Sequence, residues 1–334
     1  MKRFDVYGIG NALMDFEYRV SEAPLSRLQV DKGHMTLIDE QRLAELRNAL
    51  KNHEVRKLAG GSAANTVFAV RGFGGNVRYS CSVAADATGT EFIVAMRSAG
   101  IVAPEPRDEA GVSGCCLVLV TPDAERSMNT FLGVSRDVPP TCIDFAALQL
   151  SHFLYVEGYL ASSPTSVEAV TIARESIERS PVKTSITLSD VNVIRGAKAQ
   201  MERLLSNGVD LMFCNEHEAL AWCATDRLDI AFKELGDIAD QVVVTLGSRG
   251  CALGRRRRIL EVATNPVAAV DLNGAGDMFA GAFLACITND HDTQTAASFA
   301  NYAASRQVRT VGGRLPSMTH YAELWSEFGL NLER

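Results

Sequence analysis

The segment VDLNGAGDMFAGAF, residues 270–283, combines a tight turn with the start of an apolar helix. The small residues Gly274, Ala275 and Gly276 let the backbone turn sharply, and the apolar run after Asp277 is typical of a buried helix. The N–H groups of a helix's first turn have no partners within the helix and carry partial positive charge. This corner can therefore bind an anion such as a phosphate.

Asp277 lies in that first turn, where the helix dipole favours the ionised carboxylate that can accept a proton. A carboxylate would repel a phosphate at the same corner unless a substrate hydroxyl lay between the two. That arrangement is the geometry of phosphoryl transfer. The alternative is an ordinary aspartate near a helix N-terminus.

Three further segments carry residues suited to ligand binding. In AGGSAANT, residues 59–66, paired glycines permit close backbone approach and Asn65 offers both a donor and an acceptor, although a plain turn before a packed helix is the alternative. The segment VTLGSRG, residues 244–250, follows a strand, and α/β sheets bind ligands beyond such strand ends. NEHE, residues 215–218, offers oxygen ligands that suit Mg²⁺ held through water, or merely solvated carboxylates.

The apolar pattern alternates short extended runs with longer helical ones, which predicts a mostly parallel sheet covered on both faces. The expected strands are Phe4–Ile9, Val77–Val83, Phe153–Tyr155, Ser185–Leu188, Leu211–Cys214 and Val242–Leu246. The expected helices are a segment capped by Asp39 with Leu43, Leu46 and Leu50 on one face, Thr90–Ala99, Pro164–Arg179, Lys198–Ser206, Glu216–Cys223 and Ile230–Ala239.

Two stretches, about 16–38 and 112–132, alternate without a helical period, so we expect antiparallel strands there that form a small β lid outside the main sheet. No repeat and no Pro-, Gly- or Ser-rich linker interrupts the chain. Residues 1–334 are therefore expected to form a single domain.

Composition excludes several classes of protein. The 334 residues carry a net charge of −7, which argues against a nucleic-acid partner, and Arg255–Arg258 are expected to form a solvated hairpin turn without a role. The sequence holds no run of 18 apolar residues and no apolar leader, and its eight cysteines lack regular spacing, so we expect a cytoplasmic protein that does not contact membranes. Walker and dinucleotide motifs, histidine metal spacings and a serine-hydrolase elbow are also missing.

In order and spacing, residues 60–65, 215–218, 245–250 and 271–277, with GNALMD at 10–15, resemble the ribokinase-like (PfkB-type) carbohydrate and nucleoside kinases. The resemblance spans nearly the whole chain and implies a Rossmann-like three-layer α/β sandwich with a β-strand lid. It also implies ATP and Mg²⁺ as cofactors.

The resemblance further implies a role for each matching residue. Asp277 would be the catalytic base, beside an anion hole at Gly274, Ala275 and Gly276. Substrate hydroxyls would be held by Asn11, Asp15, Gly60, Gly61 and Asn65. The nucleotide would contact Thr245, Gly247, Gly250 and Asn301, with Asn215 beside it and Glu218 associated with the metal ion.

Within that family, the adenosine kinase branch is the most similar, through Asn273, residues 155–159 and 302–305, and Arg126, which would face the phosphates. Tyr159 and Leu13 would sandwich a purine ring, although such residues are more often simple core. Leu272 departs from the usual Thr, which bears on local hydrogen bonding and on the K⁺ site that some members build from the loops of Asp271 and residues 312–313.

We therefore expect an ATP-dependent kinase that phosphorylates the primary hydroxyl of a ribosyl substrate, foremost the 5′-hydroxyl of adenosine. The alternatives are a kinase of a free sugar such as ribose or fructose, and a non-catalytic nucleoside or sugar sensor. Exposed lid edges would also permit a homodimer.

Overall fold

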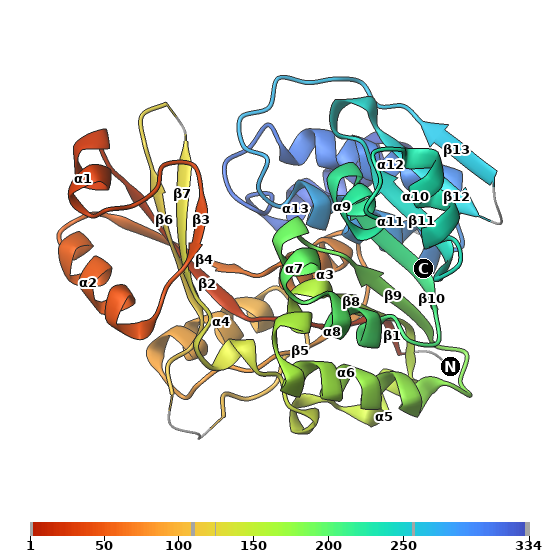
Figure 1. Cartoon of the computed structure of the whole chain (residues 1–334), viewed down its shortest axis with the longest axis horizontal. Coiled ribbons are helices and arrows are strands. Elements are labelled where there is room, and N and C mark those ends of the chain that lie inside the picture. The colour runs from red at the N-terminus through yellow and green to blue at the C-terminus, as the bar shows by residue number, and fades with distance from the viewer. Residues whose placement is uncertain (1–2, 108–110, 124, 256–257, 331–334) are drawn as a thin grey trace.

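The computed structural model of this chain describes residues 3–107, 111–123, 125–255 and 258–330. A large sheet flanked by helices makes up the body, and a smaller sheet projects from one side of it, on the left in Figure 1. The expected α/β sandwich with a mostly parallel central sheet and a small β lid is confirmed.

The large sheet has eight strands in the order β13-β12-β11-β10-β9-β8-β1-β5. The pairs from β5 to β11 are parallel, whereas β12 and β13 form an antiparallel edge. The strands are β1 (Phe4–Ile9), β5 (Val77–Ser80), β8 (Ser151–Glu157), β9 (Lys183–Thr187), β10 (Val209–Asn215), β11 (Ala239–Thr245), β12 (Cys251–Arg255) and β13 (Arg258–Val262). All six strands expected for this sheet are present; Phe4–Ile9 has the expected bounds, and the ends of the other five are shifted.

Helices cover both faces of this sheet because its strands are apolar on both sides. In β11, Val243 packs into the core on one face, while Val242 and Val244 pack into the core on the other. The first face carries α3 (Ser62–Gly72), α4 (Ala87–Ser98), α11 (Ala275–Thr288), α12 (Thr293–Gln307) and α13 (Met318–Glu327). The second carries α5 (Phe145–Gln149), α6 (Pro164–Ile177), α7 (Val191–Gly196), α8 (Lys198–Leu204), α9 (Glu216–Trp222) and α10 (Leu228–Leu235).

The lid sheet has the order β3-β7-β6-β2-β4. Its strands are β2 (Leu13–Arg19), β3 (Met35–Leu37), β4 (Val55–Gly60), β6 (Cys115–Val120) and β7 (Arg126–Phe131). The expectation of purely antiparallel strands is wrong, because β2 pairs with β6 and β3 with β7 in parallel, and residues Glu22–Arg27 form the helix α1. Two neighbouring strands are parallel when the chain between them crosses back to the same end of the sheet. The alternation of residues within each strand does not reveal this relative direction.

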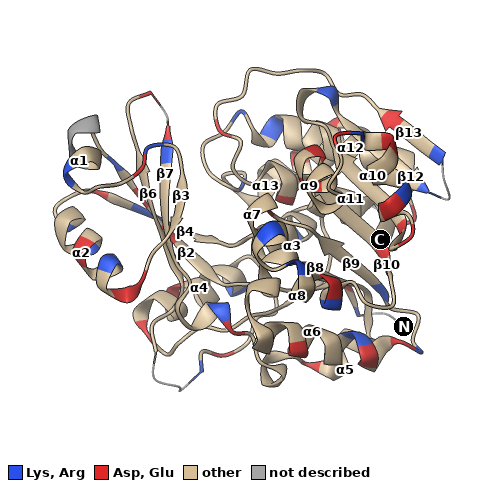
Figure 2. Ribbon diagram, viewed as in Figure 1, with Lys and Arg blue, Asp and Glu red and all other residues tan. Residues whose placement is uncertain are grey.

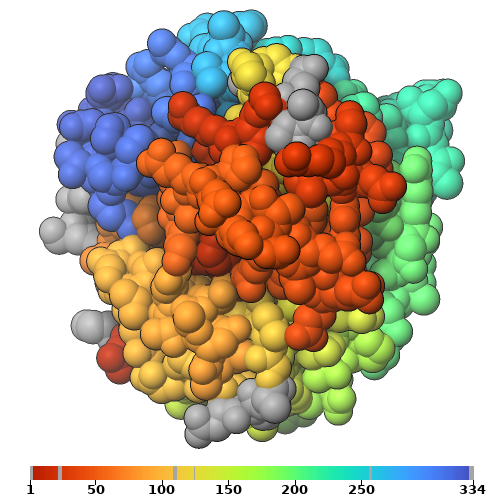
Figure 3. Space-filling view, turned by 90° about the vertical axis from the view of Figure 1, so that its left-hand side faces the viewer, coloured from red at the N-terminus to blue at the C-terminus, as the bar shows by residue number. Residues whose placement is uncertain are grey.

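Helix α2 (Glu40–Leu50) forms as its pattern predicts, but it lies beside the lid (Figure 1) and not over the large sheet as expected. Leu43, Leu46 and Leu50 are buried, and the Asp39 side chain accepts a hydrogen bond from the Arg42 N–H, so Asp39 is the expected N-cap. Figure 3 shows the N-terminal segments, in red and orange, over much of the surface on the lid side.

Charged residues of both signs are interspersed along the ribbon in Figure 2. The hairpin expected around the arginine run joins β12 to β13, and Arg256 and Arg257 lie outside the described residues. Within the described residues, no helix combines the length and apolar character that crossing a membrane requires.

Phe283 tests the core beneath α11. Its ring is fully buried and meets the Phe213 ring edge-on at a centroid distance of 5.5 Å. Because the cavity left by truncation cannot fill, Phe283→Ala is expected to lower the free energy of unfolding by about 3–5 kcal/mol, measured by urea denaturation. Val94→Ala, at an exposed position of α4, is the control and is expected to change it by less than about 0.5 kcal/mol. Equal effects of the two substitutions would contradict this description of the core.

Candidate active site

The N-terminus of α11 forms the corner that the sequence predicts. Gly274 precedes the helix with φ of 73°, and a Cβ at that position would lie 2.3 Å from the Gly313 carbonyl oxygen. Only glycine fits both constraints. A Cβ built at Gly276 would meet no atom within 4 Å, so the backbone of the first turn is open to a ligand.

Asp277 is held by two side chains of α3. Its Oδ1 accepts a hydrogen bond from Ser62 Oγ at 2.7 Å, and its Oδ2 accepts one from Asn65 Nδ2 at 3.0 Å. Burial raises the pKa of Asp277 to about 6, while these hydrogen bonds and the charge of Arg314 lower it. The carboxyl group is therefore mostly ionised at neutral pH, but less strongly than the helix dipole alone would predict.

A cavity of about 880 Å³ lies in front of Asp277, between the lid and the ends of the body's strands. Asn11, Asp15, Gly61 and Asn65 line it, so the structure brings these predicted substrate residues together with Asp277. Asn11 Oδ1 is buried and has no hydrogen-bond partner within the described structure. Such an orphaned acceptor fits a ligand hydroxyl.

Gly61 lines this cavity, whereas Gly60, the other predicted glycine, lies next to it and is not among the lining residues. A Cβ at Gly60 would lie 2.6 Å from Asp15 Oδ2, because β4 and β2 are paired there. Gly61 has φ of 95°, and a Cβ on it would lie 2.3 Å from the Asn11 carbonyl oxygen. The two glycines thus allow Asp15 and Asn11 to approach the start of α3.

Sequence reasoning assigned no role to Glu157, at the end of β8. The buried carboxylate accepts hydrogen bonds from the N–H groups of Asn11 and Ala63, each at 2.7 Å, and so ties two loops of the cavity together. Burial raises its pKa to about 7. No local pattern signals this role, because the partners are 146 and 94 residues away along the chain.

Apolar side chains also line the cavity. Leu13 of β2 and Tyr159, in the 3₁₀ turn Gly158–Ser162, both line it, as predicted for a purine site. The lid adds four apolar residues that were not expected at the site: Met35, Leu37, Met128 and Leu132. Met128 and Leu132 are four positions apart along the lid strand and its extension, with the lining residue Thr130 midway, so strand alternation is the signal that would have found them.

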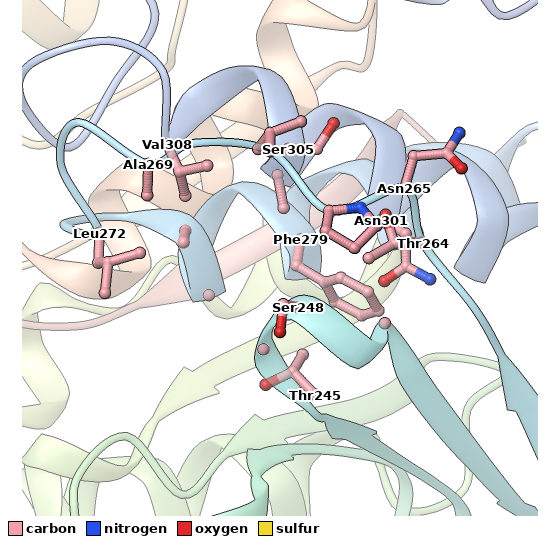
Figure 4. A pocket seen from close by; sticks show the side chains of 17 residues that line it. Thr245, Ser248, Thr264, Asn265, Ala269, Leu272, Phe279, Asn301, Ser305 and Val308 are labelled. Atoms are coloured by element: carbon pink, nitrogen blue, oxygen red, sulfur yellow. The ribbon is translucent and has the colours of Figure 1, made fainter.

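A second cavity, of about 220 Å³, lies on the other side of the same corner (Figure 4). The predicted nucleotide residues Thr245, Gly247, Gly250 and Asn301 all line it. Asn301 also has a structural task, since its Nδ2 donates to the Val262 carbonyl oxygen at 2.9 Å.

Gly276 lines both cavities, which therefore meet at the N-terminus of α11. Ala275 lines the smaller cavity, whereas Gly274 and Asp277 line the larger one. The three residues of the predicted anion hole thus lie at the junction.

Asn215 and Glu218 form a capping box at the start of α9. Asn215 Oδ1 accepts from the Glu218 N–H at 2.8 Å, and Glu218 Oε2 accepts from the Asn215 N–H at 3.0 Å. Both residues line the larger cavity, and burial raises the pKa of Glu218 to about 7. Their oxygens suit Mg²⁺ bound through water, although no cluster of three or more His, Cys, Asp or Glu side chains in the described ranges is arranged to hold a metal.

Arg126 is placed differently from the expectation that it faces phosphates. Its guanidinium lies between Glu17 of the lid, at 3.1 Å, and Asp271 of the body, at 3.2 Å. The other contacts of the Asp271 carboxylate are the N–H groups of Asn273 and Gly312, at 2.9 and 2.8 Å. Each oxygen of the Asp271 carboxylate therefore already has at least one partner within the protein.

Four carboxyl groups of the larger cavity have a raised pKa: Asp15, Glu157, Glu218 and Asp277. The folded protein therefore binds more protons than the unfolded chain between about pH 4 and 7, and its free energy of unfolding falls as pH rises through that window. Asp15→Asn removes one such group. The decrease in the free energy of unfolding between pH 5.5 and pH 8, measured by urea denaturation, should therefore be smaller in this variant than in the wild type.

The matched control is Glu175→Gln, an exposed position on α6, which should leave the pH dependence unchanged. If Asp15→Asn had no more effect than this control, the burial of the Asp15 carboxyl group in the cavity would be contradicted.

Comparison with known proteins agrees with this geometry. A solved structure described as a probable sugar kinase from Rhizobium etli CFN 42 is 30% identical, with a TM-score of 0.89 over 99% of this chain and 100% of the other. The adenosine kinase of Sinorhizobium meliloti is 29% identical, with a TM-score of 0.88 over 97% and 99% of the two chains. The adenosine kinase of Saccharomyces cerevisiae is 26% identical over 92% of this chain and 96% of its own length.

Residues 32–320 match the pfkB family carbohydrate kinase, and that match covers most of the chain. The relatives are named as kinases of nucleosides or sugars. The chain therefore belongs to the pfkB family of carbohydrate kinases.

Proposed function

We propose that the protein transfers a phosphoryl group from ATP to the primary hydroxyl of a ribosyl substrate, foremost the 5′-hydroxyl of adenosine, giving AMP. The observation that carries this proposal is the meeting of two cavities at the N-terminus of α11, where Gly276 lines both and Asp277 faces the larger one.

Asp277 is the general base of the proposed reaction. Its carboxylate takes the proton of the acceptor hydroxyl as that oxygen forms a bond to the γ-phosphorus. The bond between the γ-phosphorus and its bridging oxygen breaks, and ADP leaves with the electron pair. In this proposal, the N–H groups at Gly274, Ala275 and Gly276 stabilise the charge on the transferring group.

The polar lining residues of the larger cavity suit a ribose. Asp15 and the unpartnered Oδ1 of Asn11 are acceptors for sugar hydroxyls. Asn65 already uses Oδ1 and one amide N–H within the protein, so it has its second N–H left for the substrate.

The apolar lining residues favour a nucleoside over a free sugar. Leu13 and Tyr159 line the same cavity as Asp15, and a planar base would cover these two side chains, which ribose or fructose would leave exposed. A free-sugar kinase is the second candidate, favoured by the polar lining residues and by the relative named as a probable sugar kinase. A non-catalytic sensor is the third and is distinguished by binding without ATP consumption.

Thr245, Gly247, Gly250 and Asn301 would hold ATP in the smaller cavity. Bound Mg²⁺ would neutralise phosphate charge, with Glu218 and Asn215 reaching it through water. A cytoplasmic location and a homodimer through the lid stay predictions; the exposed edge strand β3 is the surface available for such pairing.

The rate of turnover and its pH dependence test whether Asp277 is the general base. With Mg-ATP, we expect ADP release for adenosine in a panel that also contains inosine, guanosine, cytidine, ribose and fructose. Because the pKa of Asp277 is raised to about 6, kcat/KM should fall as pH drops below about 6, where the carboxyl group is protonated. Asp277→Asn should lower kcat by at least about a hundredfold while substrate binding persists.

Asp290→Asn, in the exposed turn after the same helix, is the matched control and should retain full activity. Substantial turnover by Asp277→Asn would remove Asp277 as the base. Turnover of a free sugar alone would replace the nucleoside, and binding without turnover of any compound would support the sensor.

The Arg126–Asp271 ion pair yields a separate expectation about monovalent cations. Because the Asp271 carboxylate is already occupied, replacing K⁺ by choline at constant ionic strength should leave kcat unchanged. Strong activation by K⁺ over choline, followed in the same ADP assay, would show that Asp271 exchanges its partners during catalysis.

A further inference from the structure

Arg314 lies in the segment between α12 and α13, and sequence analysis gave it no role. Its guanidinium stacks over the Phe68 ring at 4.3 Å, and its Nη2 lies 3.9 Å from Met96 Sδ. Its Nε donates a hydrogen bond to Asn65 Oδ1 at 2.7 Å. The next residue is also fixed, because the Leu315 N–H donates to the Tyr321 hydroxyl at 3.1 Å. The planar group is therefore held in one place.

The contact with Arg314 decides which way the Asn65 amide points. Arg314 offers only donors, so Asn65 must present its oxygen to it. Asn65 Nδ2 then points the other way, where it donates to Asp277 Oδ2 at 3.0 Å. A flipped amide would set N–H against N–H at Arg314 and oxygen against carboxylate at Asp277. Both contacts of the flipped form are repulsive, so the cation selects the orientation that suits Asp277.

The positive charge of Arg314 also favours the ionised carboxylate of Asp277. The carboxyl groups of Asp15, Glu157, Glu218 and Asp277 line the larger cavity, together with the guanidinium of Arg136. The positive charge of Arg314 lowers the pKa of both Asp15 and Asp277, against the burial that raises them. Burial lowers the pKa of Arg314 itself to about 10, so it stays protonated at neutral pH.

We propose that Arg314 is a positioning residue for phosphoryl transfer, which orients the Asn65 amide toward Asp277 and keeps that carboxylate ionised at neutral pH. The inference rests on the proposed function, in which Asp277 is the base. Arg314 touches neither the substrate nor the reacting atoms in this account; it acts through Asn65 and through its charge.

The test measures kcat/KM for the acceptor from pH 5 to 9 at saturating Mg-ATP in three variants. Arg314→Met keeps an apolar stem but removes the charge and the donor. Arg314→Lys keeps the charge but loses the planar fork. Arg309→Met, at an exposed position of the same segment, is the matched control.

The acid limb of the pH profile is the range in which kcat/KM falls as pH drops. For Arg314→Met we expect this limb to move up by about one pH unit, because the ionised form of Asp277 loses a favourable charge. Its plateau at high pH should also fall, by about tenfold or more, since the amide is no longer oriented. Arg314→Lys should keep the wild-type acid limb and show only the lower plateau. Arg309→Met should match the wild type in both.

A purely structural role for Arg314 would lower thermal stability and the plateau without moving the acid limb. A folded Arg314→Met with the wild-type limb would overturn the electrostatic part of the proposal. If Arg314→Met does not fold, Arg314→Lys provides the test. An unchanged kcat/KM plateau in Arg314→Lys would overturn the proposal that Arg314 orients the Asn65 amide. A shifted acid limb in that variant would overturn the proposed role of the positive charge. Absence of phosphoryl transfer in the wild type would instead refute the proposed function itself.

Coupling to Asn65 gives a second readout. If Arg314 acts through the amide, the plateau loss in the double variant Arg314→Met/Asn65→Ala should equal the loss in Asn65→Ala alone. Losses that multiply would show that the two residues act independently, and would contradict orientation through Asn65.

Discussion

The hydrogen bonds from Ser62 and Asn65 to Asp277 are the contacts on which the rest of the site depends. They join the first turns of α3 and α11, two helices that pack side by side on one face of the large sheet. Each helix begins at a glycine whose conformation another side chain could not adopt without strain. The carboxylate therefore faces the larger cavity in a fixed orientation, next to the anion-binding corner of its own helix.

The larger cavity carries an electrostatic cost that the proposed function would explain. Several carboxyl groups face one space, and burial raises the pKa of each of them. Such groups favour a ligand that brings hydroxyl donors, since each new hydrogen bond offsets part of the desolvation. The lid connects to this system through Arg126, which pairs with Glu17 on its own sheet and with Asp271 beside the anion-binding corner.

Local sequence patterns predicted most of the fold and the residues at the junction of the two cavities. Gly274–Gly276 and Asp277 could be placed because a turn, a helix start and an acid are adjacent in sequence. The partners of Asn65 could not, because Arg314 lies 249 residues further along and only the packing of α3 brings it close. The parallel pairing of β2 with β6 was missed for the same reason, since register between distant strands leaves no local signal.

The most direct test of the central claim is a crystal structure of the protein with adenosine and a non-hydrolysable ATP analogue. The account predicts the ribose 5′-hydroxyl within about 2.6–3.2 Å of an Asp277 carboxylate oxygen, with the base against Leu13 and Tyr159. It further predicts the terminal phosphate of the analogue at the N–H groups around Gly276. A different substrate group facing Asp277, or a carboxylate turned away from Ser62 and Asn65, would contradict it.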